Sequence, residues 1–254
     1  MERSSVLKLI ADFFQPLYRQ GPGGRNETLK ALSFLSPSCL SRELKIADIG
    51  CGTGAQTLVL AENTKGTITA IDFLPEMLDG LNARMKLHGF QDRVASLLVS
   101  MDNLPFNENE LDLIWAEGSI FGIGFNRGIT EWKKYLKTGG LIAVTEMSWL
   151  TINRSFEIEQ YLTSCYSEVD LVSSKIRQME SAGYLPVANF VLPETCWTIN
   201  YYKLVQGRFN SFLKEQRYSE EAKQFVGMMK EEIDYYEKYK AYYGYVFYIG
   251  KKIG

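Results

Sequence analysis

The sequence predicts an α/β protein with a doubly wound, mostly parallel sheet of seven strands. Three observations support this fold class. From Leu44 onward, short apolar runs alternate with helical patterns; a glycine-rich turn joins the first run to a helix; and the chain closes in an aromatic, β-branched run. Such alternation is typical of βαβ units, which favour parallel sheets with helices on both faces. A length of 254 residues fits one such domain with insertions, residues 1–254.

Two helices are expected before the first strand. Apolar residues from Val6 to Leu17 recur at helical spacing, so the first helix is predicted to end near Pro16. Arg19 to Thr28 is predicted to be a loop because it is rich in glycine and proline. A second helix follows through "ETLKALSFL". Residues 1–43 are therefore interpreted as N-terminal helices and a lid.

Residues 44–149 carry five predicted strands. Their sequences are "LKIADIG", "GTITAID", "RVASLLVS", "LDLIWAE" and "LIAVTEMSW". Helices are predicted from Gln56 to Glu62, from Pro75 to Leu87 and around Thr130 to Leu136. This order predicts a ligand-binding core whose strands are joined through helices.

The remainder of the chain is predicted to form a helical cap and the last two strands. Residues 150–239 contain helical patterns, including a stretch from about Asn200 to Tyr239, and one strand in "YLPVANFVLP". Residues 240–254 contain the final strand, "AYYGYVFYIGKK". The tyrosines that lead into this strand are expected to pack against the sheet.

Composition excludes several classes of function. The chain has 28 Lys and Arg against 30 Asp and Glu, a net charge of −2, so nucleic acid is not an expected partner. Four well-separated cysteines without a C-x-x-C motif, and the single His88, predict a reducing compartment and no metal site. No apolar run is long enough to span a bilayer, so a cytoplasmic location is expected.

The stretch "IADIGCGTGAQT" is the most informative segment of the chain. A glycine-rich turn that follows a strand and opens a helix lets a ligand approach the backbone and the free N–H groups of the helix. Gly50, Gly52 and Ala55 also satisfy the dinucleotide-binding fingerprint, and Asp72 lies where an acidic residue would accept ribose hydroxyls. On spacing alone, a nicotinamide dinucleotide remains possible.

Asp48, two positions before the first glycine, argues for a different ligand. A carboxylate at this turn would repel a pyrophosphate, whereas it would favour a ligand that carries an ammonium and a sulfonium. The sequence therefore predicts a cationic ligand at the turn.

Three segments resemble the class I S-adenosylmethionine-dependent methyltransferases. "ADIGCGTG" matches their D-x-G-x-G-x-G loop, "AID" matches their second acidic position, and "SMDNLPF" is the third match. The resemblance covers roughly Lys45 to Met147 and is closest to the small-molecule branch that includes the ubiquinone/menaquinone-biosynthesis C-methyltransferases. It implies a Rossmann-like methyltransferase fold, S-adenosyl-L-methionine as cofactor, S-adenosyl-L-homocysteine as product and a small-molecule acceptor.

The resemblance also implies which residues contact the cofactor. Gly50, Cys51 and Gly52 would pass close to its methionyl part, with Asp48 near the amino end, and Asp72 would accept both ribose hydroxyls. The complete expected set is Gln20, Gly21, Asp48, Gly50, Cys51, Gly52, Thr53, Gln56, Asp72, Phe73, Leu74, Met77, Ser100, Met101, Asp102, Glu117 and Gly118.

The contacts to adenine are divided between two segments. Phe73 and Leu74, with Met77 nearby, would form an apolar slot for the ring. Many relatives have an aspartate at the position of Ser100 for the adenine amine. Here either Asp102 takes that role or Met101 and its backbone do.

Catalytic residues can be few, because methyl transfer from a sulfonium is an in-line displacement with an activated leaving group. A base is needed only if the acceptor still carries its proton, and the candidates are Glu117, Glu146 and Tyr18.

His88 is interpreted as a helix-capping residue and Cys51 as a small residue suited to the turn. The alternatives are a non-catalytic S-adenosylmethionine-binding protein and, third, an NAD-dependent oxidoreductase.

Overall fold

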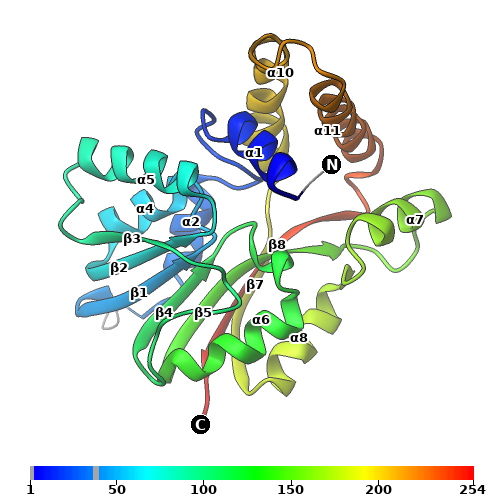
Figure 1. Cartoon of the computed structure of the whole chain (residues 1–254). Helices are drawn as coiled ribbons and strands as arrows, with labels where there is room; N and C mark the ends of the chain where they lie inside the picture. Colours follow the sequence, from blue (N-terminus) through cyan, green and yellow to red (C-terminus); the bar gives the residue numbers. More distant parts are fainter. Residues whose placement is uncertain (1–2, 37–39) are drawn as a thin grey trace.

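An eight-stranded sheet forms the centre of the protein in the computed structural model, which describes residues 3–36 and 40–254 (Figure 1). The strand order is β3-β2-β1-β4-β5-β8-β7, and β6 pairs with β5 outside this path. The strands are β1 (Glu43–Ile49), β2 (Lys65–Asp72), β3 (Val94–Leu98), β4 (Leu111–Ala116), β5 (Leu136–Trp149), β6 (Asp170–Leu171), β7 (Tyr184–Val191) and β8 (Tyr243–Lys252).

Helices precede, separate and cap these strands. The α-helices are α1 (Arg3–Phe14), α2 (Arg25–Leu32), α4 (Ala55–Asn63), α5 (Pro75–Leu87), α6 (Phe125–Trp132), α7 (Phe156–Cys165), α8 (Val172–Ser181), α9 (Glu194–Trp197), α10 (Lys203–Glu215) and α11 (Glu220–Tyr239). Short 3-10 helices span Ile120–Gly122 (η1) and Lys133–Tyr135 (η2), and a π-helix spans Thr198–Tyr202 (η3).

The predicted fold class is confirmed, with one additional strand. Strands β1 to β6 pair in parallel, whereas β8 lies antiparallel between β5 and β7. The predicted count of seven was one too low, because the two-residue strand β6 lies within a segment whose apolar pattern is helical. Its pairing with Ser148 and Trp149 of β5 is a long-range contact that local periodicity does not reveal.

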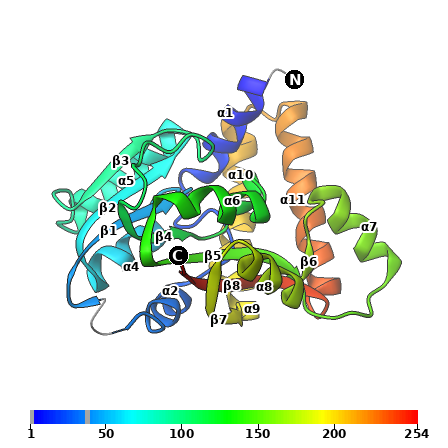
Figure 2. The ribbon, with the colours of Figure 1, turned by 90° about the horizontal axis from the view of Figure 1, so that it is seen from below.

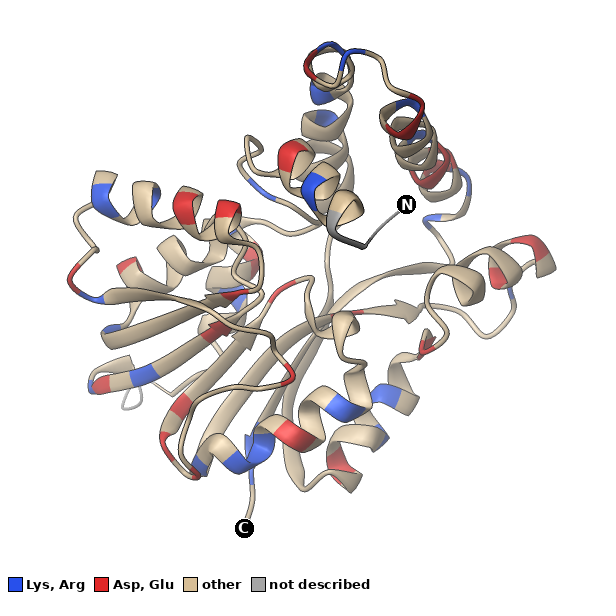
Figure 3. Cartoon of the chain, in the orientation of Figure 1, with Lys and Arg blue, Asp and Glu red and all other residues tan. Residues whose placement is uncertain are grey.

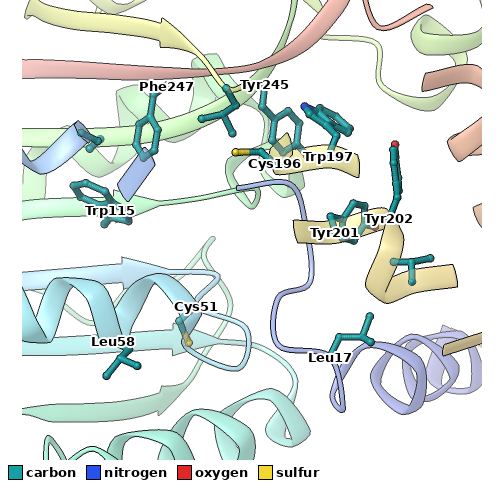
Figure 4. Packing of buried hydrophobic residues seen from close by; sticks show 14 of the residues in the cluster. Leu17, Cys51, Leu58, Trp115, Cys196, Trp197, Tyr201, Tyr202, Tyr245 and Phe247 are labelled. Carbon is teal, nitrogen blue, oxygen red and sulfur yellow. The ribbon is translucent and has the colours of Figure 1, made fainter. Parts of the chain in front are cut away.

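Helices cover both faces of the sheet. One buried cluster joins α2, α4 and α5 to strand residues such as Ile46 and Trp115, and the other joins α6 and α8 to Ile114 and Val144. Figure 2 shows the same arrangement from below, and Figure 4 shows Trp115 beside Phe247, with their ring centroids 5.5 Å apart. Charged residues of both signs are interspersed over the outer helices (Figure 3).

Within the predicted cap, residues 150–239, helices α10 and α11 form a hairpin beside α1. Residues 200–239 were predicted as one helical stretch, but a turn between α10 and α11 interrupts it. Arg217 and Tyr218 adopt the left-handed conformation there, and the Ser219 side chain accepts the Ala222 N–H to start α11. Phe13 of α1 packs edge-on against Phe212 and Phe225, so the hairpin and the first helix share one core. Figure 1 shows α1 beside α10.

The topology places a crevice at the carboxyl end of β1. Strand β1 is flanked by β2 on one side and by β4 on the other. The chain therefore adds β2 and β3 on one side of β1 and then crosses over to add β4 and β5 on the other side. Ligands of open α/β sheets bind outside the carboxyl ends of the strands at such a switch point. The glycine turn and the residues that follow β2, β3 and β4 all lie at this edge.

Candidate functional site

The glycine turn is closed by backbone hydrogen bonds to β2. The N–H groups of Gly50 and Cys51 both donate to the Ile71 carbonyl oxygen, at 2.8 and 2.9 Å. Gly50 has a φ of +72°, and a Cβ there would lie 2.3 Å from the Cβ of Ser119. Glycine is therefore required for both the backbone conformation and the close approach of the loop after β4.

Asp72 joins the turn to the loop after β2. One carboxylate oxygen accepts the Gly52 N–H and the other accepts the Leu74 N–H, each at 3.0 Å. Burial raises the pKa of Asp72, and the hydrogen bonds from Leu74 and Gly52 act in the opposite direction. Because a carboxylate oxygen has further acceptor capacity, this group can also accept ligand hydroxyls.

An aromatic side chain lies open to solvent next to Asp72. Phe73 is 50% exposed, whereas Leu74 and Met77 are buried in a small cluster with α1. An exposed ring on a buried apolar base is suited to stacking against a planar ligand. The expected adenine slot therefore has an accessible ring at Phe73, while Leu74 and Met77 support it from below.

The loop after β3 carries an internal hydrogen-bond network. The Ser100 hydroxyl donates to an Asp102 carboxylate oxygen at 2.9 Å, and Arg127 forms an ion pair with the other oxygen at 2.9 Å. The indole N–H of Trp132 donates to the Met101 carbonyl oxygen at 3.2 Å. The three residues thus form one fixed loop at the expected adenine edge, and Asp102 stays half exposed.

Asp48 lies beneath the turn with none of its surface exposed. Its carboxylate accepts the Thr57 hydroxyl at 2.6 Å and the Gln56 amide at 3.3 Å. Burial raises its pKa to about 7, against the effect of these two hydrogen bonds. The Asp48 carboxylate is thus buried and bonded to α4, and its role next to the amino end of the cofactor stays a prediction.

The N-terminal segment is fixed onto the turn by Gln20. Its amide oxygen accepts the Thr53 N–H at 3.0 Å, and its amide nitrogen donates to the Thr53 hydroxyl at 3.0 Å. Gly21 has no heavy atom within 4 Å of the position that a Cβ would occupy. Gln20 and Thr53 are therefore brought together at the turn.

Glu117 is fully engaged by protein partners. One oxygen pairs with Arg19, and the other accepts the Thr28 hydroxyl at 2.6 Å and the Trp115 indole N–H at 2.9 Å. Next to it, the Gly118 N–H donates to the Thr145 hydroxyl at 2.7 Å. Glu117 thus ties the N-terminal segment to the end of β4, a role that its sequence position did not reveal.

Glu146, at the end of β5, forms a buried ion pair with Lys175 of α8 at 3.1 Å. Burial raises the pKa of Glu146, and the charge of Lys175 opposes this increase. Tyr166 also borders this carboxylate, and its hydroxyl acts with Lys175 to oppose the increase. Tyr18, the third catalytic candidate, is exposed and stacks against the Arg84 guanidinium at 4.4 Å.

Two basic residues, Arg19 and Lys175, form ion pairs with the candidate carboxylates but were not predicted from the sequence. Both are buried and neutralise candidate carboxylates. Lys175 lies four residues before the buried Met179, so helical spacing alone places it on the inner face of α8. Arg19 lies in a loop, where no periodicity indicates its burial.

Cys51, inside the glycine turn, is buried. Burial raises the pKa of Cys51 well above its ordinary value, which disfavours the reactive thiolate. Cys51, Cys165 and Cys196 are free thiols, and Cys39 lies outside the described residues. Within residues 3–36 and 40–254, no cluster of His, Cys, Asp or Glu is arranged to hold a metal, and no helix could cross a membrane.

Comparison with known proteins agrees with this geometry. A family model described as a methyltransferase domain matches residues 46–140. The methyltransferase GfsG of Streptomyces halstedii is 29% identical over 104 residues, which are 41% of this chain and 37% of GfsG. Residues 46–140 thus match a methyltransferase domain.

Other relatives of the methyltransferase domain show how far the similarity extends. The ubiquinone/menaquinone biosynthesis C-methyltransferase UbiE of Geobacter sp. (strain M21) is 27% identical over 111 residues, 42% of this chain and 47% of UbiE. The matched segment thus spans less than half of these two relatives.

The fold of the methyltransferase domain recurs in solved structures over nearly the whole chain. A methyltransferase from Geobacter sulfurreducens, solved in complex with S-adenosyl-L-homocysteine, has a TM-score of 0.79 at 18% identity. That comparison covers 96% of this chain and 97% of that protein. A methyltransferase from Thiobacillus denitrificans has a TM-score of 0.78 at 17% identity and covers 98% of both chains. The cap and the last strands therefore belong to a fold arrangement shared with complete methyltransferases.

Proposed function

We propose that this protein transfers a methyl group from S-adenosyl-L-methionine to a small-molecule acceptor by in-line displacement. The observation that carries this proposal is the carboxylate of Asp72, held between the glycine turn and the loop after β2 by two backbone N–H groups. A fixed carboxylate at the carboxyl end of β2, beside the exposed ring of Phe73, suits a nucleoside with two free ribose hydroxyls.

The residues present fit this cofactor in chemistry and in space. Asp72 would hold the ribose, Phe73 would stack on the adenine, and the loop of Ser100 to Asp102 would border its edge. Gly21 has no heavy atom within 4 Å of its Cβ position, which leaves the backbone open next to Gln20. Bound there, the cofactor would supply a methyl group on a sulfonium, a leaving group that is already activated.

The chain's own residues would then orient the acceptor and exclude water. We assign Glu117 a positioning role, because both of its oxygens are engaged by Arg19, Thr28 and Trp115. Glu146 is likewise buried, paired with Lys175 and bordered by Tyr166, so we assign it a structural role as well. Residues 150–239 would form the cap over the acceptor.

Calorimetric titration tests the cofactor assignment. Wild type should bind S-adenosylmethionine and S-adenosylhomocysteine, and Asp72→Ala should bind both at least about tenfold more weakly, about 1.4 kcal/mol. Asp79→Ala, which removes an exposed aspartate of α5, is the matched control and should bind as wild type does. Binding of NAD in place of both ligands would support the oxidoreductase alternative and overturn the proposal.

A second experiment separates an enzyme from a non-catalytic binding protein. Quinols, phenols and amines are incubated with S-adenosylmethionine and the full chain, and release of S-adenosylhomocysteine is measured. Acceptor-dependent release supports methyl transfer, whereas binding without release for every acceptor class supports the binding protein.

A cytoplasmic location and the absence of nucleic-acid partners remain predictions of the sequence.

A further inference from the structure

A carboxylate interrupts the apolar inner face of the cap helix α11. Phe225, Met229, Tyr236 and Tyr239 recur at spacings of four, seven and three residues, and all four are buried. Glu232 lies three residues after Met229 and four before Tyr236, so helical geometry places it in the same stripe. An ionisable residue at such a position is unfavourable for packing alone.

Glu232 has no charged partner in the described part of the chain. Its carboxylate accepts one hydrogen bond, from the Tyr202 hydroxyl at 3.1 Å, and none of the described Lys or Arg side chains pairs with it. Burial raises the pKa of Glu232, although part of its surface remains accessible to solvent. Glu232 is therefore largely desolvated but not completely covered by the protein.

Tyrosines of α11 itself and of three other segments, α7, η3 and β8, lie around this carboxylate. We refer to Tyr161, Tyr201, Tyr202, Tyr235, Tyr236, Tyr243 and Tyr245 as the tyrosine cluster. The rings of Tyr161 and Tyr235 stack face to face at 3.7 Å, and those of Tyr202 and Tyr236 meet edge-on at 5.4 Å. Figure 4 shows Tyr201, Tyr202 and Tyr245 near Trp197, across from the glycine turn that carries Cys51.

The tyrosine cluster is electrically neutral apart from Glu232. Burial raises the pKa of Tyr201, Tyr202 and Tyr243, and the nearby negative charge of Glu232 raises each of them further. These phenols therefore stay protonated and present neutral ring faces and edges. One carboxylate among such rings is an environment suited to a cation.

The cluster extends to the catalytic edge of the sheet. A ring carbon of Tyr245 lies 3.6 Å from the position that a Cβ on Gly118 would occupy. Gly118 directly follows Glu117 in the loop after β4, where the proposed cofactor site ends. An acceptor bound against Tyr245 and Glu232 would thus lie between the cap and the carboxyl ends of the strands.

We propose that the methyl acceptor carries a cationic amine group, and that Glu232 and the tyrosine cluster receive this group. The inference rests on the proposed function and narrows its substrate class. A cation would neutralise a carboxylate that has no ionic partner, and the tyrosine rings would add cation–π attraction. A neutral quinol or phenol would leave the charge of Glu232 uncompensated in the closed site.

The test uses choline and tetramethylammonium as cationic probes, with the full chain saturated with S-adenosylhomocysteine. The matched neutral probe is the carbon isostere of choline, in which a tert-butyl group replaces the trimethylammonium group. By calorimetry, at least one cation should bind, and the isostere should bind at least about tenfold more weakly than choline. Glu232→Gln should weaken cation binding by at least about tenfold and leave the affinity for S-adenosylhomocysteine within about twofold of wild type.

Glu221→Gln, an exposed position in the first turn of the same helix, is the control and should bind both ligands as wild type does. Thermal melting by circular dichroism checks that each variant is folded. Normal S-adenosylhomocysteine binding without cation binding, equal affinity for choline and its isostere, or unchanged cation affinity in Glu232→Gln would each overturn the amine assignment alone. Cation binding without S-adenosylhomocysteine binding would support the cation site and contradict the proposed function.

Discussion

Gln20 and Thr53 form a reciprocal pair of hydrogen bonds between the N-terminal segment and the glycine turn. The Gln20 amide accepts the Thr53 N–H and donates to its hydroxyl, both at 3.0 Å, and it also donates to the Leu17 carbonyl oxygen at 2.9 Å. One side chain thus holds the turn and the segment after α1 in a single arrangement. The segment is 33 residues away in sequence, so the contact exists only in the folded chain.

Gln20→Ala should loosen the N-terminal segment and weaken cofactor binding. Loss of the two bonds leaves the Thr53 N–H without this partner, and we expect S-adenosylhomocysteine affinity to fall about tenfold by calorimetry. Limited proteolysis should cut the segment after α1 faster than in wild type. Gln15→Ala, which leaves the Gln20–Thr53 pair intact, is the matched control, and an equal effect of both variants would contradict the assignment.

Gly52→Ala should have a larger effect than Gln20→Ala. The backbone at Gly52 has a φ of +54°, and the new Cβ would lie 2.3 Å from the Gln20 amide oxygen. The substitution therefore displaces Gln20 and adds left-handed strain of about 1–2 kcal/mol. Urea unfolding should show this destabilisation, and the double variant Gln20→Ala/Gly52→Ala should lose less than the sum of the single variants.

Gly207→Ala is a control in which the change from glycine to alanine should stabilise the protein. Gly207 lies within α10, is exposed, and has no heavy atom within 4 Å of its Cβ position. Alanine there should stabilise the protein by about 0.5–1 kcal/mol, because glycine is unfavourable in a helix interior. Destabilisation by Gly207→Ala would contradict the argument from helix propensity and free space at this position.

Asp48 should make the protein less stable as pH rises. Its pKa is 3.8 without the fold and about 7 in the folded protein, so the unfolded chain releases this proton first. The contribution of this group to stability is fully present below about pH 4 and is lost progressively up to about pH 7. The total loss between the two pKa values is on the order of 4 kcal/mol.

Asp48→Asn should remove this pH dependence, because an amide does not ionise. Urea unfolding of both proteins at about pH 5 and about pH 8 measures the difference directly. The variant should gain stability relative to wild type as pH rises. A constant difference between the two proteins over this range would contradict a raised pKa for Asp48.

Lys175→Met should destabilise the protein by about 3–5 kcal/mol, because it leaves the buried Glu146 carboxylate without its cation. The double variant Lys175→Met/Glu146→Gln should recover much of the loss, since neither charge then remains buried. Equilibrium unfolding measures both values. Arg127→Met, which breaks an exposed ion pair with Asp102, should leave the unfolding midpoint nearly unchanged. No recovery in the double variant would show that the Glu146–Lys175 pairing is not what stabilises this region.

The sequence by itself determined the features that depend on local spacing. The helix predicted from Pro75 to Leu87 occurs with these bounds, and the glycine turn follows β1 and opens α4 as predicted. Proline at a helix start, glycines with positive φ and alternating apolar runs act over a few residues, so their consequences can be read directly from the chain. The position of Asp72 at the end of β2 followed from the same patterns.

Only the tertiary structure decided which distant side chains meet. Arg19 pairs with Glu117 and Lys175 with Glu146 across many residues, and α4 covers the Asp48 carboxylate. Strand β8 inserts antiparallel between β5 and β7. Local periodicity indicates which face of a helix or strand is apolar. It does not indicate which other element covers that face, because the pairing of elements depends on packing across the whole chain. The charge balance of the site is therefore a property of the fold.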